Sequence, residues 1–218
     1  MKALPDKAFI AALRIGPEKN FCYMIMCTET FETALIDPAF DYDHIVTWVS
    51  ENSKDKATVS YLLATHGHWD HARGMNKMLK FYPAAKVVAH KLEEKRCGEL
   101  EVLLDLKVSD QDVLKLGRLN IRCIHLPGHT EGGLGYQVGD QIFTGDTLFI
   151  GQCGRTDLSG GSDKKLFESL QKLKELDPQL IVRPGHDYGP KPMTTLLEQC
   201  KTNPTMLAKN LAEFTALP

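Results

Sequence analysis

The sequence of 218 residues has no long hydrophobic run. Asp, Glu, Lys or Gly interrupts each apolar stretch well short of the roughly 20 residues that a membrane-spanning helix needs. The segment from Met1 to Lys7 has no apolar core followed by a small-residue cleavage site, so we expect no secretory signal. These absences predict a protein without a membrane partner.

Basic excess and paired cysteines are missing as well. A formal net charge of −2 without any long basic run gives no electrostatic reason to expect a nucleic-acid partner. The 6 cysteines form no C-x-x-C pair and no dense framework, which is typical of reduced thiols rather than of a disulfide scaffold. We therefore expect a cytoplasmic protein, with an organelle matrix as the alternative.

The composition that remains is that of an ordinary globular protein, with 43% hydrophobic and 25% charged residues. The length and the lack of repeats or linkers predict one α/β domain over residues 1–218, ending in a short helical tail. Residues 91–110 are acidic and irregular, with room for a helix. Strands are predicted at 9–15, 21–27, 33–36, 59–64, 86–89, 113–116, 119–126, 135–138, 141–143 and 180–182, and helices at 43–49, 72–82 and 163–176, before one or two C-terminal helices.

The most informative segment is residues 65–71, with the sequence T-H-G-H-W-D-H, at the end of a predicted buried strand. His66 and His68 lie two positions apart on extended backbone, so their side chains can point to the same side. Asp70 and His71 fall where the next helix should begin, and approach from the other side. Neutral imidazoles together with a carboxylate suit zinc, iron or manganese.

Three more candidate ligands follow a glycine at the end of a predicted strand, namely His129, Asp146 and His186. The glycine allows a sharp turn, so each side chain can aim into a shared cleft. Two adjacent divalent metal ions, with zinc favoured, fit this set better than one, and leave open positions for a shared water or hydroxide. One site would take His66, His68 and His129, the other Asp70, His71 and His186, with Asp146 as a bridge.

These motifs resemble the signature of the metallo-β-lactamase superfamily, T-H-x-H-x-D-H followed by His, Asp and His. The resemblance covers about residues 37–186 and implies an αββα sandwich, with the metal site at one edge of the two sheets. It is less specific for the reaction, because one scaffold hosts many chemistries. Further matching segments are Asp37-Pro38, Pro127-Gly128-His129-Thr130, Thr144-Gly145-Asp146-Thr147-Leu148-Phe149 and Pro184-Gly185-His186-Asp187-Tyr188.

Two branches of the superfamily are most similar, the glyoxalase II-type thioesterases and the persulfide dioxygenases. The H-W-D-H and G-D-T-L-F segments resemble the first, whereas Cys153-Gly154-Arg155-Thr156-Asp157 and His186-Asp187-Tyr188 resemble the second. Both branches act on glutathione conjugates, which implies a small-molecule substrate of that type. The resemblance makes Arg155 the candidate that holds a substrate carboxylate and Tyr188 a polar lining residue.

The favoured function is a glyoxalase II-like thioesterase that acts through a metal-bound hydroxide, with Asp70 binding one metal and orienting the hydroxide. The first alternative is a persulfide dioxygenase with a single Fe(II) on His66, His129 and Asp146. A lactonase or other ester hydrolase, and a binding module without activity, are further alternatives. A true β-lactamase is disfavoured, because those enzymes do not typically retain the bridging aspartate that Asp146 matches. The tail after His186 is shorter than in typical glyoxalase II proteins, and nothing in the sequence indicates an oligomeric state.

Overall fold

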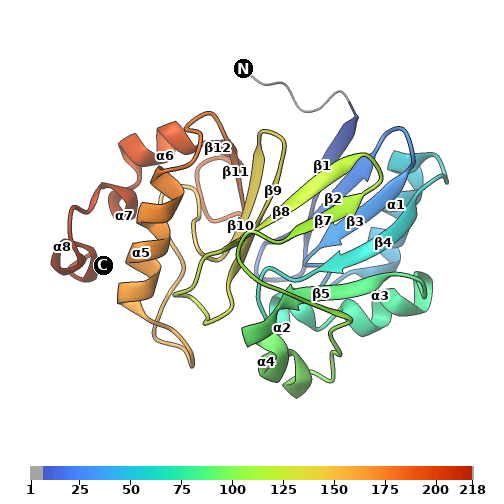
Figure 1. The fold of residues 1–218 in the computed structure, drawn as a ribbon, viewed down its shortest axis with the longest axis horizontal. Coiled ribbons are helices and arrows are strands. Elements are labelled where there is room, and N and C mark those ends of the chain that lie inside the picture. The colour runs from blue at the N-terminus through green and yellow to red at the C-terminus, as the bar shows by residue number, and fades with distance from the viewer. Residues whose placement is uncertain (1–6, 218) are drawn as a thin grey trace.

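Two six-stranded sheets lie face to face in the computed structural model, which describes residues 7–217 (Figure 1). Each sheet keeps its strands in chain order, so neighbours in sequence are neighbours in space. The first sheet contains β1 (Ala8–Ile15), β2 (Asn20–Cys27), β3 (Glu32–Ile36), β4 (Thr58–Leu63), β5 (Lys86–His90) and β6 (Leu106–Val108). The second contains β7 (Val113–Leu116), β8 (Leu119–His125), β9 (Leu134–Val138), β10 (Gln141–Gly145), β11 (Ile181–Pro184) and β12 (Thr194–Thr195).

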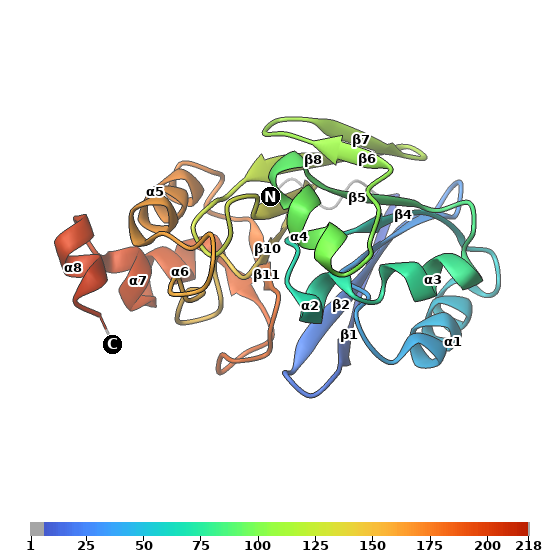
Figure 2. The same cartoon turned by 90° about the horizontal axis from the view of Figure 1, so that it is seen from below.

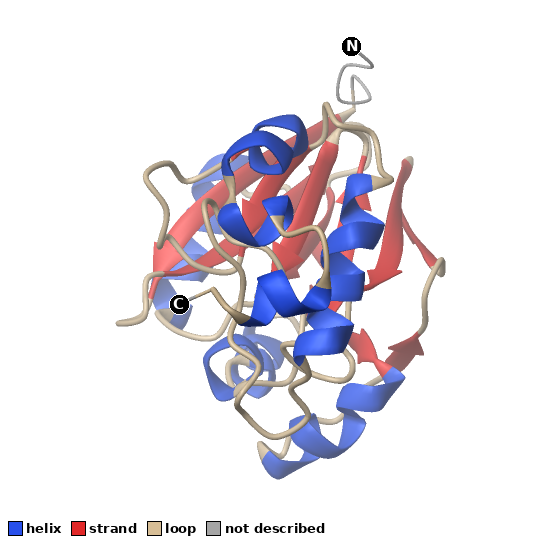
Figure 3. Cartoon of the chain, turned by 90° about the vertical axis from the view of Figure 1, so that its left-hand side faces the viewer, coloured by secondary structure: helices blue, strands red, loops and turns tan. Residues whose placement is uncertain are grey.

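Helices cover the outer faces of both sheets, and Figure 3 shows those of the C-terminal half in front of the strands. None of the helices within residues 7–217 has the length and apolarity needed to cross a membrane. The helices of the first half are α1 (Tyr42–Ser53), α2 (Trp69–Ala72), α3 (Met75–Phe81), the short 3₁₀ helix η1 (Lys91–Glu93) and α4 (Glu94–Glu99). Those of the second half are α5 (Asp163–Lys174), α6 (Leu196–Thr202), α7 (Pro204–Leu207) and α8 (Leu211–Thr215).

Strand β2 shows how the layers form, because it is buried on both faces. Tyr23 and Ile25 point into the core between the sheets, whereas Cys22 and Met24 point into the core beneath the first-half helices. The alternation follows from the two-residue period of a strand. Together with a third core under α5, this packing confirms the predicted αββα sandwich.

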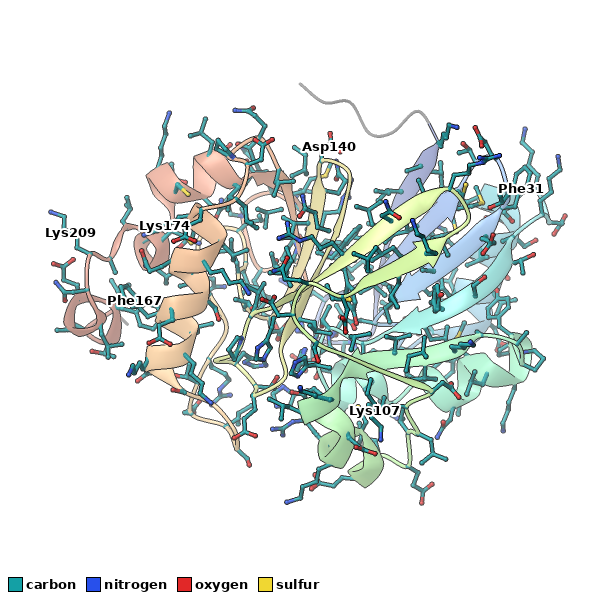
Figure 4. The ribbon with its side chains drawn as sticks, in the orientation of Figure 1. Phe31, Lys107, Asp140, Phe167, Lys174 and Lys209 are labelled. Atoms are coloured by element: carbon teal, nitrogen blue, oxygen red, sulfur yellow. The ribbon has the colours of Figure 1, made fainter. Side chains whose placement is uncertain are left out.

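Helix α5 closes the second outer layer. It begins after Ser162, whose hydroxyl accepts a hydrogen bond from the backbone N–H of Lys165 and caps the helix. Leu166 and Leu170, a helical turn apart, are fully buried against the second sheet. Phe167, labelled in Figure 4, instead packs on Phe214 of α8, with ring centroids 5.8 Å apart. Helix α8 is therefore held against α5, while Leu196 of α6 and Met206 of α7 join the core that α5 covers.

Two local predictions were wrong, and one expected helix is shorter. Of the helix expected at 72–82, residues 75–81 form α3, whereas Ala72 is the last residue of α2. Strand β6 lies in the segment expected to be irregular, and its three residues are too few to show a pattern. The tail has β12 and three helices instead of one or two helices. The segment examined for a secretory signal lies, apart from Lys7, outside the described residues.

Two buried tyrosines connect the sheets beside the strand ends that carry the histidine motifs. The Tyr23 hydroxyl of the first sheet donates to the Pro184 carbonyl at the end of β11, at 2.7 Å. The Tyr136 hydroxyl of the second sheet donates to the Ala64 carbonyl, directly after β4, at 2.8 Å. Each bond satisfies a carbonyl that would otherwise be buried without a partner. The pair fixes the ends of β4 and β11 relative to the opposite sheet.

We predict that Tyr23→Phe and Tyr136→Phe each lower the free energy of unfolding by about 1–3 kcal/mol, because each leaves a buried carbonyl without its donor. Urea unfolding followed by circular dichroism measures the change. Tyr61→Phe is the matched control, since that partly buried tyrosine packs on the same core but its hydroxyl has no hydrogen-bond partner within residues 7–217. Losses equal to that of the control would contradict the role of the two bonds.

Candidate metal centre

The seven predicted ligands converge at one edge of the sandwich. His66 and His68 follow β4, and Asp70 and His71 lie in α2. The other three follow β8, β10 and β11. Figure 2, seen from below, shows α2 beside the ends of β10 and β11, as the contacts between these segments require. The structure thus brings together His66, His68, Asp70, His71, His129, Asp146 and His186.

Three imidazoles form the first trio, composed of His66, His68 and His129. The His66 Nε2 lies 3.0 Å from the His68 Nδ1, and the same His68 nitrogen lies 2.9 Å from the His129 Nε2. His66 and His129 are buried, and His68 is partly exposed to the adjoining cavity. One ligand atom from each ring therefore faces a common point, as the sequence predicted.

The second trio comprises Asp70, His71 and His186. The Nε2 atoms of the two histidines lie 3.1 Å apart, and the Asp70 Oδ2 is 3.5 Å from each of them. Asp146 lies between the trios. Its carboxylate is 3.4 Å from His71, 3.3 Å from His186 and 3.6 Å from His129 of the first trio.

Hydrogen bonds on the outer side fix the orientation of four rings. The Nδ1 atoms of His71, His129 and His186 face the Asp37 carboxylate and the backbone carbonyls of Arg155 and Glu18, at 2.9, 2.7 and 2.8 Å. Such oxygens only accept, so these Nδ1 atoms carry the proton and the Nε2 atoms face inward. His66 Nδ1 similarly faces the Thr65 hydroxyl at 3.1 Å.

The inward atoms form a donor set that suits a metal ion. Neutral rings held in this way direct the unshared electron pairs of their Nε2 atoms into the centre. The Asp146 Oδ1 is buried without a hydrogen-bond partner among the described residues. Imidazole nitrogen and carboxylate oxygen are the ligands that zinc and first-row transition metals prefer. The residues present therefore fit one or two such ions.

The second trio holds a proton tightly when no metal is bound. Burial disfavours the charged imidazolium of His71, but Asp146, Asp37 and Asp70 together outweigh it and raise the pKa of His71 to about 10. Burial likewise opposes the charge on His186, yet its hydrogen bond to Asp146 gives a net rise of the His186 pKa. Burial also opposes the charge on Asp146, but His71 and His186 hold the pKa of that carboxyl well below its usual range.

Two members of the first trio, His66 and His68, behave in the opposite way. Burial, followed by the electrostatic influence of His129 and Arg96, lowers the pKa of His68 to about 4. Burial and the adjacent imidazoles, His71 first among them, lower the pKa of His66 well below its ordinary value. These two nitrogens are therefore unprotonated at neutral pH and ready to bind a metal ion, whereas His71 has to release a proton first.

Two of the glycines before the ligands have the backbone conformation that their positions require. Gly128 and Gly145 have φ angles of 138° and 50°, a region that side chains with a Cβ rarely adopt. The sequence reasoning that a glycine turns the chain into the cleft holds for the segments that present His129 and Asp146. At Gly185 a glycine is needed for lack of space instead, because a Cβ there would lie 2.3 Å from the Asp146 Oδ1.

Sequence reasoning missed the residues that hold the ligands in place. Asp37 accepts hydrogen bonds from both the N–H and the hydroxyl of Thr65 as well as facing His71. The buried Asn20 donates to the Asp70 Oδ2 at 3.1 Å and to the Asp70 carbonyl at 3.0 Å. Asp37 was visible only as part of the Asp-Pro motif, and no pattern in the sequence connects Asn20 with Asp70.

A cavity of about 410 Å³ opens beside both trios and would admit a small molecule. Trp69, Leu158 and Tyr188 line it and are 46%, 40% and 43% exposed, so much of its wall is apolar or aromatic. Tyr188 stacks on His186 with ring centroids 4.6 Å apart. Arg155 also lines the cavity, but its guanidinium makes two hydrogen bonds of 2.6 Å to its exposed neighbour Asp157. Both predicted substrate contacts therefore reach the cavity.

Comparison with known proteins agrees with the fold. A family model described as the metallo-beta-lactamase superfamily matches residues 15–186. The chain is 31% identical to the probable polyketide biosynthesis zinc-dependent hydrolase PksB of Bacillus subtilis, over 79% of this chain and 75% of that protein. It is 30% identical to the probable hydroxyacylglutathione hydrolase glo2 of Schizosaccharomyces pombe, over 79% of this chain and 66% of that protein.

Among solved structures, ETHE1 from Myxococcus xanthus is similar with a TM-score of 0.85 and 28% identity, over 96% of this chain and 92% of that one. The chain belongs to the metallo-β-lactamase superfamily, in its glyoxalase II-like branch. The predicted family and fold are confirmed.

We predict that metal binding at the second trio releases about one more proton per ion than binding at the first, because the high pKa of His71 keeps it protonated. The variants His68→Ala and His186→Ala each leave one trio complete. Calorimetric titration with zinc in two buffers of different ionisation enthalpy counts the released protons. At pH 6 the water bound to zinc does not lose a proton and so does not add to the count. Equal release in both variants would contradict the assignment.

Proposed function

We propose that this protein is a metal-dependent thioesterase of the glyoxalase II type, which cleaves a glutathione-type thioester into a carboxylic acid and a thiol. The observation that carries the proposal is the position of Asp146, buried within 3.6 Å of ligand nitrogens of both trios. A carboxylate in that position suits a bridge between two ions. The metals would lower the pKa of a shared water towards neutrality and polarise the thioester carbonyl.

The chain's own residues would prepare the centre for this hydrolysis. Asn20 holds the Asp70 carboxylate towards the centre, where it can bind one metal and orient the attacking water. Asp37 and the Glu18 carbonyl hold His71 and His186, so the ligands need little rearrangement during the reaction. A thiolate is a good leaving group, so a dedicated general acid is not required.

The cavity supports a thioester of modest size. Its apolar and aromatic wall would hold the acyl group, and Arg155 at the rim would bind a carboxylate of the thiol portion. The similarity to a probable hydroxyacylglutathione hydrolase favours a glutathione portion. The zinc-dependent hydrolase among the relatives favours zinc as the metal.

Persulfide dioxygenation is the second candidate, favoured by the similarity to ETHE1 over almost the whole chain. His66, His129 and Asp146 would then supply two imidazoles and one carboxylate to a single iron, with positions left for substrate and oxygen. The two functions differ in metal content as well as in reaction.

Metal analysis of protein purified from medium balanced in iron and zinc tests the choice. We expect about two metal ions per chain, as bridged sites require, and hydrolysis of S-lactoylglutathione without oxygen uptake on glutathione persulfide. Asp146→Ala should lose metal and thioesterase activity together. One iron per chain with oxygen uptake would support the dioxygenase, and full activity of Asp146→Ala would refute the bridge.

We further predict that Asp157→Asn lowers KM for S-lactoylglutathione about three- to tenfold, because a substrate carboxylate no longer competes with Asp157 for Arg155. Arg155→Ala should raise KM with little change in kcat, since uniform binding is lost. Glu168→Gln, which removes an exposed pairing with Lys164, is the control. An unchanged KM in Arg155→Ala would exclude this residue as a substrate contact.

A further inference from the structure

Glu93 is a buried acidic residue outside the set of predicted ligands. It ends η1, only 1% of its surface is exposed, and its two carboxylate oxygens have separate partners. Oε2 accepts a hydrogen bond from the Gly67 N–H at 2.9 Å, and Oε1 accepts one from the Gly132 N–H at 2.8 Å. A buried carboxylate is unfavourable unless it is fully paired, so its presence needs an explanation.

The two partners belong to the loops that supply the first trio. Gly67 lies between His66 and His68, and Gly132 lies three residues after His129. These loops follow β4 of the first sheet and β8 of the second. One side chain thus connects the two loops that carry the three residues of the first trio. Asp70, His71 and His186 have no hydrogen bond to Glu93 among the described residues.

Both partner positions accommodate the carboxylate only because they are glycine. A Cβ at Gly67 would lie 2.8 Å from the Glu93 Oε2, and a Cβ at Gly132 would lie 2.7 Å from the Glu93 Cγ. Such distances are shorter than real Cβ contacts, so a larger residue at either position would displace the side chain. The glycine in each loop therefore leaves the space that the Glu93 side chain occupies.

Arg96 completes the arrangement one helical turn later. Its Nε lies 3.2 Å from the Glu93 Oε2 as an ion pair without hydrogen-bond geometry, and its Nη2 donates to the Ser159 carbonyl at 2.7 Å. Ser159 adjoins Leu158, which lines the cavity. The pair therefore balances the buried charge and also contacts the loop at the substrate side of the centre.

We propose that Glu93 is a positioning residue for the metal ion of the first trio. It sets the distance between the His66–His68 loop and the His129 loop, so that three nitrogens from two sheets meet at one point. The inference rests on the proposed function, because it requires the trio to bind metal. Its consequence is selective, since loss of Glu93 weakens metal binding at the first trio and leaves the second unchanged.

The test compares Glu93→Gln and Glu93→Asp in the full chain. Glutamine keeps the volume, but its NH₂ group faces one of the two backbone N–H donors. Aspartate is too short to reach both loops. Each change is combined with His186→Ala, which leaves only the first trio complete, and with His68→Ala, which leaves only the second.

Cobalt(II) affinity is measured by competition with a chromophoric chelator, and the cobalt absorption spectrum reports the ligand geometry. Glu99→Gln, an exposed residue of α4, is the matched control.

We expect Glu93→Gln to weaken cobalt binding about 10–100-fold in the His186→Ala background, as removal of a residue supporting metal ligands does, and to shift the absorption bands. In the His68→Ala background the affinity should stay within about twofold, the spread expected of a surface change such as Glu99→Gln. Glu93→Asp should give an intermediate loss, and it provides the result if the glutamine variant does not fold.

Equal losses in both backgrounds would show that Glu93 only stabilises the fold, and no loss in either would show that it does not position the trio. Either result overturns the inference while leaving the proposed function intact. Failure of the unmodified protein to bind cobalt or zinc would overturn the proposed function and the inference with it.

Discussion

The convergence of five imidazoles and two carboxylates at one edge of the sandwich is the constraint on which the centre depends. Each imidazole directs a nitrogen towards a neighbouring ring or carboxylate within about 3.5 Å, an arrangement that suits a cation. Burial opposes a charge on His71, but the carboxylates of Asp146, Asp37 and Asp70 outweigh it and raise the pKa of His71 to about 10, so this ring carries a proton in the absence of metal. The fold has to hold this arrangement in place, so the packing and hydrogen bonds around it are part of the site.

Oxygen atoms on the outer side of the rings fix the orientation of most of the imidazoles. Asp37 faces His71, whereas His129 and His186 rely on backbone carbonyls. Tyr23 and Tyr136 fix the strand ends from which the ligand loops start. Four of the five rings are therefore oriented from outside, with the other nitrogen directed into the centre. Such orientation reduces the rearrangement that metal binding requires.

The inner centre and the outer cavity differ in what they say about the reaction and about the substrate. The seven candidate ligands meet in the inner centre, and one such centre on a common fold can serve different reactions. The proposed selection of a substrate would depend on the cavity wall, where aromatic surface lies next to the paired Arg155 and Asp157. The charge of the rim is balanced within this pair, so a carboxylate on the substrate would have to replace Asp157.

The sequence by itself identified the seven residues that meet at the candidate centre, and its resemblance to a known family implied the layer order. His66, His68, Asp70 and His71 are close in the chain, and the later ligands follow glycine at strand ends, where backbone geometry leaves few directions for a side chain. Alternating burial along strands such as β2 likewise reflects a local period. Only the tertiary structure decided that Glu93, Asn20 and the Arg155 carbonyl support the centre. Their contacts join distant segments or use backbone atoms, which no residue pattern encodes.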